Sequence, residues 1–338
     1  MKILYLSAHS VLEYDELRLF EELGYDYFSI GAYINPQKPH DNKRPALNGT
    51  YHEHLASIAM VHNADNLHEE QVKWADVVIV MHLPQWIEKN WPLFKKLKKR
   101  VIWRSIGQSV EGIENRIAPF RKEGLEIVRY SPTEVKIPNS AGSDAIIRFY
   151  KDPEEFEPWK GGSEEVITFC QSMKSRGKFC NYEVFENVAK GFKAHVYGPN
   201  NDDAGDLNGG LLDYDGLKHK MRDAGVYFYG GTHPASYTLN FIEAFMTGIP
   251  IVAVGSGYGN SKDFSQDTYE VPEIIVNGLH GFYSDSIEEL RKFTKALLKD
   301  RGLAEQISKQ ARMKAIDLFD KKLIKKQWRE YLEHGKQD

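Results

Sequence analysis

Polar side chains suited to holding a nucleotide diphosphate gather in one stretch of the chain, residues 232–254. The pattern predicts a loop, a helix beginning near Ser236, a glycine stop and a short β-branched strand, all following an earlier strand at 226–229. A helix that begins just after a strand presents unpaired N–H groups and a positive dipole end, which favour a phosphate. Ser236 and Thr238 are candidate caps, and Glu243 follows about two turns later. An ordinary β-α-β unit explains the same pattern without a ligand.

Two motifs in the second half of the chain carry a family resemblance. The run Glu243-Ala-Phe-Met-Thr-Gly-Ile-Pro-Ile-Val resembles the E-A-M-A-x-G-x-P-V-V signature of the retaining glycosyltransferases of the GT-B fold that include glycogen and sucrose synthases. The segment 271–282 resembles the same family's E-I-I-x-D-G-x-N-G-x-L segment, with Asn277 at the Asp position and His280 at the Asn position. The resemblance extends from about Val166 to the end of the chain and covers the first half only in outline.

The resemblance implies a site for the donor nucleotide. Family members usually carry V-G-R-L-x-x-x-K-G on the first strand of the second domain, where the Arg and Lys neutralise the diphosphate. Here Gln171 stands at the Arg position and Arg176 at the Lys position, with further lysines nearby. Positive charge favours two phosphates, although a solvated basic loop needs no ligand. The implied donor-binding residues are Gln171, Lys174, Arg176, Lys178, Ser236, Tyr237, Thr238, Leu239 and Glu243.

One carboxylate that the resemblance leads us to expect is missing. Retaining members usually show two glutamates separated by seven residues, the first touching the transferred sugar and the second the ribose. Glu243 matches the second glutamate, but Ala235 stands at the first position. Either His233 and backbone groups hold the sugar, or the sugar differs from the usual hexose, or activity has been lost. A structural role for His233 in its loop is an equal alternative.

In the first half of the chain, one histidine stands out. His82 follows the apolar run 77–81, so it lies at the C-terminal end of a predicted strand. It resembles the histidine found at the same strand end in many relatives. The resemblance therefore implies a catalytic group made of His82, His233 and Arg176.

Acceptor-side candidates lie in two loops of the first domain. A later histidine of the family falls in the loop after the predicted strand 101–103, where this chain has none but keeps polar side chains. The first βα loop lacks the family's glycine pair, and Ser10 is a candidate cap for the helix that follows. The acceptor-side candidates are His9, Ser10, Arg104, Ser105 and Gln108.

We expect no metal ion and no separate cofactor. The histidines between 52 and 68 fit no standard metal spacing. Four acids resemble the D-x-D metal motif of the other glycosyltransferase architecture, GT-A, but they fall in a loop rich in Gly and Asn rather than at a strand end; they are Asp202, Asp203, Asp213 and Asp215. The donor nucleotide sugar, with UDP favoured, would be a co-substrate.

Length, charge and cysteine count exclude several classes of protein. The 338 residues suggest about two domains. The net charge of -4 gives no general attraction to nucleic acid or to an anionic membrane. Two cysteines, Cys170 and Cys180, are too few for a disulfide framework, so we expect a reducing cytoplasm. The apolar start 2–6 is too short for a signal peptide, and no apolar segment reaches the ~18 residues of a membrane span.

Strand and helix patterns alternate twice along the chain, which predicts an α/β protein of two doubly wound, Rossmann-like domains facing a cleft, with ligands at the C-terminal ends of strands. The expected strands are 2–7, 26–30, 77–81, 101–103, 126–130, 166–170, 194–197, 226–229 and 251–254. The expected helices are 13–23, 86–99, 113–123, 214–223, 287–298 and 302–331, and residues 35–70 are expected to be irregular.

Three parts of the chain are expected to have separate roles. Residues 1–155 would form an acceptor-binding domain and 163–312 a nucleotide-sugar-binding domain, joined by the polar, Pro-bearing stretch 151–163. Residues 313–338 resemble the family's C-terminal helix that crosses back to the first domain.

The resemblance implies metal-independent transfer of a sugar, with retention at the anomeric carbon, from a nucleotide-diphosphate sugar to a hydroxyl acceptor. UDP-hexose is the favoured donor. The leaving diphosphate must be stabilised as its C1–O bond breaks, which the helix beginning near Ser236 and the cation of Arg176 would do. The acceptor stays open between a glycan, a lipid, a small molecule and a modified DNA base.

Three other functions are compatible with the sequence. A catalytically silent nucleotide-sugar-binding relative would explain Ala235 and Gln171. A different doubly wound enzyme, such as a sugar epimerase, would use a similar scaffold. A glucosyltransferase acting on a modified DNA base would give the basic runs 95–100 and 321–326 phosphates to contact, although such runs are usually solvated helix faces.

Overall fold

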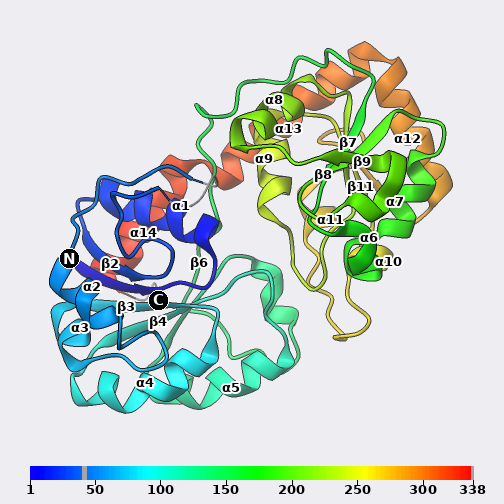
Figure 1. Ribbon diagram of the computed structural model, residues 1–338. Helices are drawn as coiled ribbons and strands as arrows, with labels where there is room; N and C mark the ends of the chain where they lie inside the picture. Colours follow the sequence, from blue (N-terminus) through cyan, green and yellow to red (C-terminus); the bar gives the residue numbers. More distant parts are fainter. Residues whose placement is uncertain (40–43, 336–338) are drawn as a thin grey trace. The chain divides into compact units, whose positions relative to one another are not determined.

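The computed structural model describes residues 1–39 and 44–335. Residues 40–43, inside the stretch expected to be irregular, and 336–338, at the end of the expected C-terminal segment, lie outside the described residues. The chain divides into two compact units, each a parallel sheet flanked by helices (Figure 1). Unit 1 comprises Met1–Phe149 and the end of the chain from Ile324, and unit 2 comprises Tyr150–Leu323. The prediction of two Rossmann-like α/β domains is confirmed.

Unit 1 is built on a six-stranded parallel sheet in the order β2-β1-β3-β4-β5-β6. Its strands are β1 (Lys2–Leu6), β2 (Asp26–Ile30), β3 (Val77–Met81), β4 (Arg100–Arg104), β5 (Glu126–Arg129) and β6 (Ala145–Ile146). Its helices are α1 (Ser10–Glu22), α2 (Glu53–Ala59), α3 (Glu69–Trp74), α4 (Pro84–Lys96), α5 (Glu111–Lys122), the 3-10 helix η1 (Pro132–Lys136) and α14 (Lys321–His334). Helices α1 and α14 cover one face of the sheet and α4 and α5 the other (Figure 1). Every residue of β3 is buried, which explains its unbroken apolar sequence.

Unit 2 repeats this plan with the order β12-β11-β10-β7-β8-β9. Its strands are β7 (Val166–Phe169), β8 (Ala194–Tyr197), β9 (Asn208–Gly210), β10 (Val226–Tyr229), β11 (Ile251–Val254) and β12 (Phe282–Ser284). Its longer helices are α7 (Tyr182–Ala189), α8 (Tyr214–Asp223), α9 (Leu239–Thr247), α12 (Ile287–Lys299) and α13 (Arg301–Phe319). Its short helices are α6 (Met173–Arg176), η2 (Gly177–Cys180), η3 (Asp202–Leu207), α10 (Ser256–Gly259) and α11 (Val271–Ile274). Helices α7 and α12 pack together, as do α8, α9 and α13.

The strand order gives each sheet one topological switch point. In unit 1 the chain runs outward in opposite directions from β1 and β3, and in unit 2 from β7 and β10. Ligands of such sheets bind just beyond the carboxyl ends of the two strands at that point, because the loops there diverge and leave room between them. We call these strand ends and the loops that follow them the unit-1 and unit-2 switch points.

The structure differs from the predicted elements in several ways, and β6, β9, β12 and α7 were not predicted. Helix α2 lies in a stretch expected to be irregular. The expected long helix 302–331 is two helices, because Asp320 leaves the helical conformation and its carboxylate accepts a hydrogen bond from Lys322 N at 2.7 Å, which begins the next helix. Helix α9 begins at Leu239 rather than near Ser236, since Thr238 N donates to the Tyr229 hydroxyl (3.0 Å) and Ser236 O accepts from Glu270 N (3.1 Å).

None of the helices within residues 1–39 and 44–335 combines the length and the apolar character that crossing a bilayer requires.

Candidate functional site

The loop after β7 forms one side of the unit-2 switch point. It turns sharply at Ser172, whose backbone is left-handed with φ 49°. The buried side chain of Asn201 stabilises this turn with two hydrogen bonds. Its Oδ1 accepts from Met173 N (2.8 Å), and its Nδ2 donates to Cys170 O (2.8 Å). The turn therefore presents α6 and its basic side chains at the carboxyl end of the sheet.

The three basic side chains of this loop have different surroundings. Lys174 donates to the backbone oxygen of Asp203 at 2.8 Å, and Lys178 forms an exposed ion pair with Asp263 at 2.6 Å. Arg176 is exposed, and its Nη1 lies 3.4 Å from Gln171 O and 3.9 Å from the Cys170 sulfur. Within the part of the chain that the structure describes, Arg176 has no carboxylate partner. Its charge is thus the one of the three best placed to meet an anion.

The start of α9 forms the other side of this switch point. Thr238 is the N-cap residue but makes no side-chain cap hydrogen bond. Asn240, in the first turn, donates from Nδ2 to Phe169 O at 2.5 Å, so α9 is fixed to the end of β7. The N–H groups of Leu239 and Asn240 have no hydrogen-bond partner among the described residues. The loop that carries Arg176 and a helix end with open N–H groups therefore meet at the last residue of β7.

Three of the predicted donor-binding side chains are buried, those of Ser236, Tyr237 and Glu243. Ser236 and Tyr237 are 1% and 2% exposed. The Tyr237 ring contacts Phe319, with ring centroids 5.5 Å apart. The side chains of Ser236 and Tyr237 thus belong to the interior of unit 2, and Ser236 does not cap α9. His233 is partly exposed, and its Nε2 lies 2.7 Å from the backbone oxygen of Tyr258.

Glu243 lies one turn into α9 rather than two, because the helix begins later than predicted. Its carboxylate is 3.0 Å from Lys151 Nζ, and both side chains are almost fully buried. The backbone N–H of Lys151 donates to Phe319 O at 3.0 Å. Glu243 therefore ties α9 to the start of unit 2, a contact that the sequence did not indicate because the two residues lie far apart in the chain.

The unit-1 switch point contains His82, directly after β3. Its backbone is left-handed with φ 63°, which a residue other than glycine rarely adopts. Two hydrogen bonds hold it there: His82 N donates to Arg104 O (2.9 Å), and the Trp103 indole donates to His82 O (3.0 Å). Burial lowers the pKa of the imidazole to about 4, so His82 is neutral at pH 7. Its buried Nδ1 has no partner within the described residues.

Arg104 and Ser105, two predicted acceptor-side residues, are fully buried. Arg104 Nε donates to Glu16 at 2.7 Å, and its guanidinium lies over the Phe149 and Trp328 rings at 4.5 and 5.4 Å. Because no part of either side chain reaches the surface, Arg104 and Ser105 stabilise the core of unit 1 and are not placed to contact an acceptor. This corrects the expectation from the sequence.

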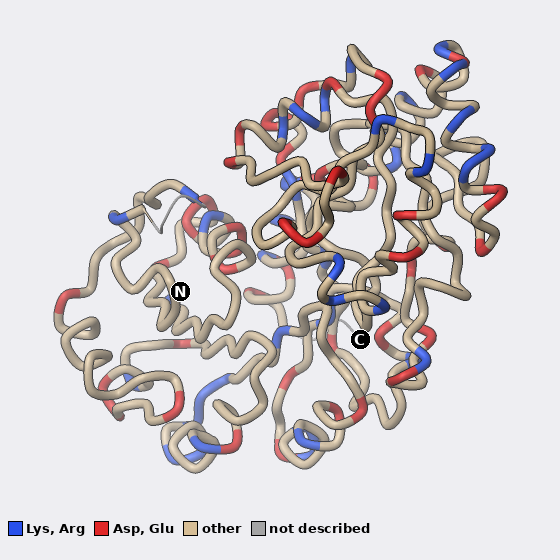
Figure 2. Tube along the Cα trace, turned by 45° about the vertical axis from the view of Figure 1, so that its right-hand side comes forward, with Lys and Arg blue, Asp and Glu red and all other residues tan. Residues whose placement is uncertain are grey.

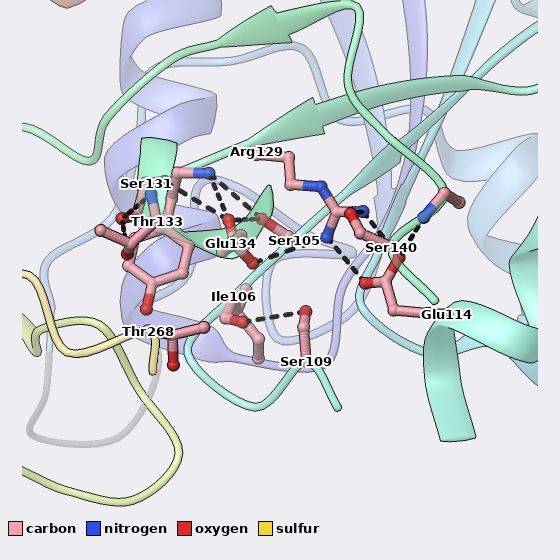
Figure 3. A network of polar contacts seen from close by, with 12 residues as sticks. Ser105, Ile106, Ser109, Glu114, Arg129, Ser131, Thr133, Glu134, Ser140 and Thr268 are labelled. Carbon is pink, nitrogen blue, oxygen red and sulfur yellow. Dashed lines mark hydrogen bonds and ion pairs between the residues drawn. The ribbon is translucent and has the colours of Figure 1, made fainter. Parts of the chain in front are cut away.

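Ser105 joins a buried polar network at the ends of β4 and β5 (Figure 3). Its hydroxyl donates to Glu134 at 2.7 Å, and two backbone N–H groups donate to the same carboxylate oxygen. Arg129 donates from both terminal nitrogens to Glu114 at 2.7 Å. Burial raises the pKa of Glu134 to about 7, against the opposing effect of the Arg129 charge. These contacts hold the loop after β5, and the other oxygen of Glu134 lies 3.9 Å from Arg129 Nη1.

The remaining acceptor-side candidates lie nearer the surface. His9 and Gln108 are exposed, and Ser10 is partly exposed. His9, not Ser10, caps α1: its Nδ1 accepts from Leu12 N at 3.3 Å, and Ser10 is the first helical residue. His9 and His82 follow β1 and β3, the two strands of the unit-1 switch point.

Asp213 and Asp215, two of the acids that resemble a metal motif, have structural partners. Asp213 caps α8 by accepting from Gly216 N at 2.7 Å, and Asp215 pairs with Lys218 at 2.8 Å. Residues 1–39 and 44–335 contain no cluster of three or more His, Cys, Asp and Glu side chains able to hold a metal ion.

The sequence did not indicate Asn240 or Lys151. Asn240 follows a candidate cap and is a short polar residue, a signal that could have suggested a role in the first turn. The contact of Lys151 with Glu243 joins distant segments that only the fold brings together.

No protein-family model and no curated protein sequence matches this chain. Solved structures are similar over nearly its whole length. The Anabaena protein HepE in complex with UDP and glucose matches with a TM-score of 0.72 at 13% identity, covering 98% of this chain and 99% of that chain. A glycosyltransferase from Rickettsia africae matches with a TM-score of 0.69 at 14% identity, covering 98% of both chains. The lipopolysaccharide outer core galactosyltransferase WaaB in its apo form matches with a TM-score of 0.61 at 13% identity, covering 99% of both.

The chain therefore has the GT-B fold, as the two sequence motifs led us to expect. Sequence identities of this size establish the architecture, and the chemistry must be argued from the site itself.

Proposed function

We propose that this protein is a glycosyltransferase that uses a nucleotide-diphosphate sugar, with a UDP-hexose as the favoured donor. The observation that carries the proposal is the likeness over 98% of the chain to HepE, whose structure contains UDP and glucose. The unit-2 switch point supports it independently, because an exposed arginine and the open end of a helix meet there.

The donor diphosphate would bind between Arg176 and the N–H groups of Leu239 and Asn240. As the bond from the sugar C1 to the diphosphate oxygen breaks, negative charge grows on the leaving phosphate. A guanidinium and backbone N–H groups already aimed at that charge stabilise it without reorganisation. The open N–H groups at the start of α9 add the favourable end of the helix dipole, worth about 0.3–1 kcal/mol per interaction at an exposed site.

We further propose that transfer proceeds with retention and without a metal ion or separate cofactor. The diphosphate itself would take the proton of the acceptor hydroxyl, so no carboxylate is required where Ala235 stands. Two groups support charge neutralisation by the protein alone, the Arg176 guanidinium and the α9 N–H groups. Glu243 would hold the ribose, with Lys151 orienting its carboxylate.

On the acceptor side, the proposed contacts are His82 and His9 at the unit-1 switch point. Gln108, in the loop after the neighbouring strand β4, is a third proposed contact. A neutral imidazole can accept a hydrogen bond from a sugar hydroxyl or donate one to it. The low pKa of His82 keeps that group uncharged throughout the neutral pH range. The acceptor is a hydroxyl compound of unspecified class.

The basic runs do not favour a DNA acceptor. Lys95, Lys96 and Arg100 pair with Glu123, Glu69 and Glu126 at 2.7 to 2.9 Å. In the second run, Lys321 pairs with Asp152 at 2.6 Å and Lys325 with Glu22 at 2.8 Å. Basic and acidic residues are interspersed over both units (Figure 2). Charges already matched by carboxylates gain little from phosphates.

Calorimetric titration with UDP, GDP and ADP, each with and without EDTA, tests the proposal. We expect UDP to bind and its affinity to survive EDTA. Incubation with UDP-glucose and a panel of acceptors, followed by NMR of the product, then reports the anomeric configuration. Binding of none of the nucleotides would reject the proposal, binding lost in EDTA would reject metal independence, and UDP binding without turnover would favour the catalytically silent alternative raised by Ala235.

A further inference from the structure

The start of α9 is held by a chain of hydrogen bonds that joins both strands of the unit-2 switch point. The hydroxyl of Tyr229, the last residue of β10, accepts from Thr238 N at 3.0 Å and lies 3.1 Å from Thr238 Oγ1. Thr238 Oγ1 donates to Asn240 Oδ1, and Asn240 Nδ2 donates to the oxygen of Phe169, the last residue of β7. We propose that Tyr229 is a positioning residue that, through Thr238, aims the Leu239 N–H at the donor diphosphate. This role depends on the proposed function.

The donors and acceptors of this chain have one consistent order. Phe169 O can only accept, so Asn240 faces it with its amide nitrogen, which leaves Oδ1 to accept from the Thr238 hydroxyl. That hydroxyl has a single hydrogen, so the Tyr229 hydroxyl donates to Thr238 Oγ1 while it accepts from Thr238 N. Burial raises the pKa of Tyr229, and its hydroxyl therefore keeps the proton that this order requires.

The Tyr229 ring is packed on several sides, which makes its hydroxyl a rigid support. Tyr229 is 3% exposed. Its ring centroid lies 5.0 Å from that of Phe241 and 6.3 Å from that of Tyr227, and the Tyr269 ring stacks on it at 6.4 Å. The hydroxyl therefore moves only if the aromatic core of unit 2 moves with it.

Thr238 turns this support into a fixed direction for one N–H group. Its backbone oxygen accepts from Phe241 N at 3.1 Å, which closes the first turn of α9. In a planar trans peptide, the C=O of one residue and the N–H of the next point in opposite directions. Because Thr238 O faces into the helix, the Leu239 N–H faces outward from its start, where it has no partner among the described residues. This peptide plane cannot turn without breaking a hydrogen bond.

The expected consequence of the fixed direction is selective for phosphate. An N–H group that already points at an anion binds it without the cost of ordering the backbone first. Tyr229→Phe keeps the ring but removes both hydrogen bonds of its hydroxyl, so the peptide plane before Leu239 is no longer held. Uridine has no phosphate and makes no use of this N–H group. The variant should therefore weaken the binding of UDP and not that of uridine.

The test compares UDP with uridine on the full chain. Calorimetry measures the Kd of UDP, and amide NMR titration of isotope-labelled protein measures the Kd of uridine and follows the Leu239 amide. In the wild type, UDP should move the Leu239 amide proton downfield and uridine should not. Tyr229→Phe should weaken UDP about tenfold, the lower end for losing a hydrogen bond to a charged group, and leave uridine unchanged. Thr238→Val breaks the chain one link further on and should weaken UDP several-fold.

Two variants control for lost packing and lost hydroxyls. Thr238→Ser keeps the hydroxyl of the chain and should bind UDP as the wild type does. Tyr269→Phe removes an equally buried hydroxyl from the ring stacked on Tyr229, where it donates to Val254 O at 3.1 Å, and should also keep the affinity for UDP. Urea unfolding shows that each variant is folded under the conditions of the titrations.

Four results would overturn the positioning role. Wild-type affinity for UDP in either Tyr229→Phe or Thr238→Val would do so and leave the proposed function standing. Equal losses for UDP and uridine would indicate damage to the whole unit rather than to one N–H group. UDP binding to the wild type without a shift of the Leu239 amide proton would reject the role without any variant. A wild-type chain that binds no UDP would reject the proposed function and this role together, so the two failures are distinguishable.

Discussion

The two sheets have the same topology, but the arginines near their carboxyl edges have opposite surroundings. In unit 1, Arg129 is buried and fixed to Glu114 by two hydrogen bonds of 2.7 Å. In unit 2, Arg176 is exposed and, among the described residues, has no carboxylate partner. The charge of Arg129 is therefore part of the core of unit 1, whereas the charge of Arg176 is available to bind an anion. Position at a strand end alone therefore does not identify a binding residue.

The difference follows from where each arginine stands relative to its strand. Arg104 and Arg129 are the last residues of β4 and β5, so their side chains enter the layer between sheet and helices and need buried partners. Arg176 comes after the strand and its turn, at the end of α6, where the side chain reaches solvent. A buried charge must be paired to be tolerated, and an exposed one need not be.

The largest expected effect comes from breaking a buried pair of unit 1. Replacing Arg129 by Met leaves Glu114 buried without its cation, which should lower the free energy of unfolding by about 3–5 kcal/mol. Arg116→Met is the matched control, since Arg116 makes the same two-point contact with Glu88 on the surface and should cost about 1 kcal/mol or less. Urea unfolding measures both. At low temperature, where Arg129→Met remains folded, its affinity for UDP should be unchanged. Equal losses of unfolding free energy in Arg129→Met and Arg116→Met would contradict the difference between buried and exposed arginines.

The second prediction concerns pH. The pKa of Glu134 is raised by burial from its ordinary value of 4.5 to about 7, so between these values the folded protein holds a proton that the unfolded chain releases. The free energy of unfolding should therefore fall as the pH rises from about 4.5 through 7. At about 1.4 kcal/mol per pKa unit, the loss is at most about 3.5 kcal/mol.

Glu134→Gln, which mimics the protonated form, should flatten this part of the stability profile. Glu111→Gln serves as the control for the loss of a surface carboxylate from the same unit. Urea unfolding at several pH values between 4.5 and 7.5 measures the slopes. An unchanged slope in Glu134→Gln would mean that the buried network of unit 1 does not titrate in this range.

The third prediction moves to unit 2. Arg176→Gln should leave stability within about 0.5 kcal/mol, because the side chain is exposed. It should weaken UDP binding by about 1.5–3 kcal/mol, at least about tenfold in Kd, through the loss of charged hydrogen bonds to phosphate. Lys190→Gln removes an exposed cation from the far end of α7 and should not change the affinity. Calorimetry compares the three proteins, and equal UDP affinities would exclude Arg176 from the site.

The smallest effect is expected at His82. Asparagine tolerates a left-handed backbone, so His82→Asn should keep the fold while removing the imidazole. UDP affinity should not change, but transfer to an acceptor should slow by about tenfold, the value of one hydrogen bond of about 1.4 kcal/mol. Steady-state kinetics with a saturating donor measure this. Normal transfer by the variant would remove His82 from the proposed acceptor side.

The sequence predicted the central strands of both sheets because their signal is local, and it missed the short strands β6, β9 and β12. The run Val77–Met81, apolar at every position, became β3, and the β-branched run Ile251–Val254 became β11. Helix α2 was missed because its sequence lies among His, Asn and Pro residues with little periodicity. The start of α9 was misplaced because the Tyr229 hydroxyl, one strand away, holds Thr238 N outside the helix.

The candidate site was predicted in outline, and its details depend on distant partners. The sequence located the cation loop and the helix, and the fold joined them through Asn240 and Phe169. It gave no means to distinguish Arg176 from the two lysines, since Asp203 and Asp263 come from other loops. The sequence likewise did not show that Arg104 is structural, because its buried partner Glu16 lies far away in the chain.

Amide hydrogen exchange of the full chain, with and without saturating UDP, measures where the nucleotide binds. We expect slower exchange in the peptides that contain 170–180 and 236–242, and no change in those that contain 5–12 and 80–86. Protection confined to the unit-1 peptides, or none at Leu239 and Asn240 when UDP is bound, would contradict the assignment of the nucleotide to the unit-2 switch point.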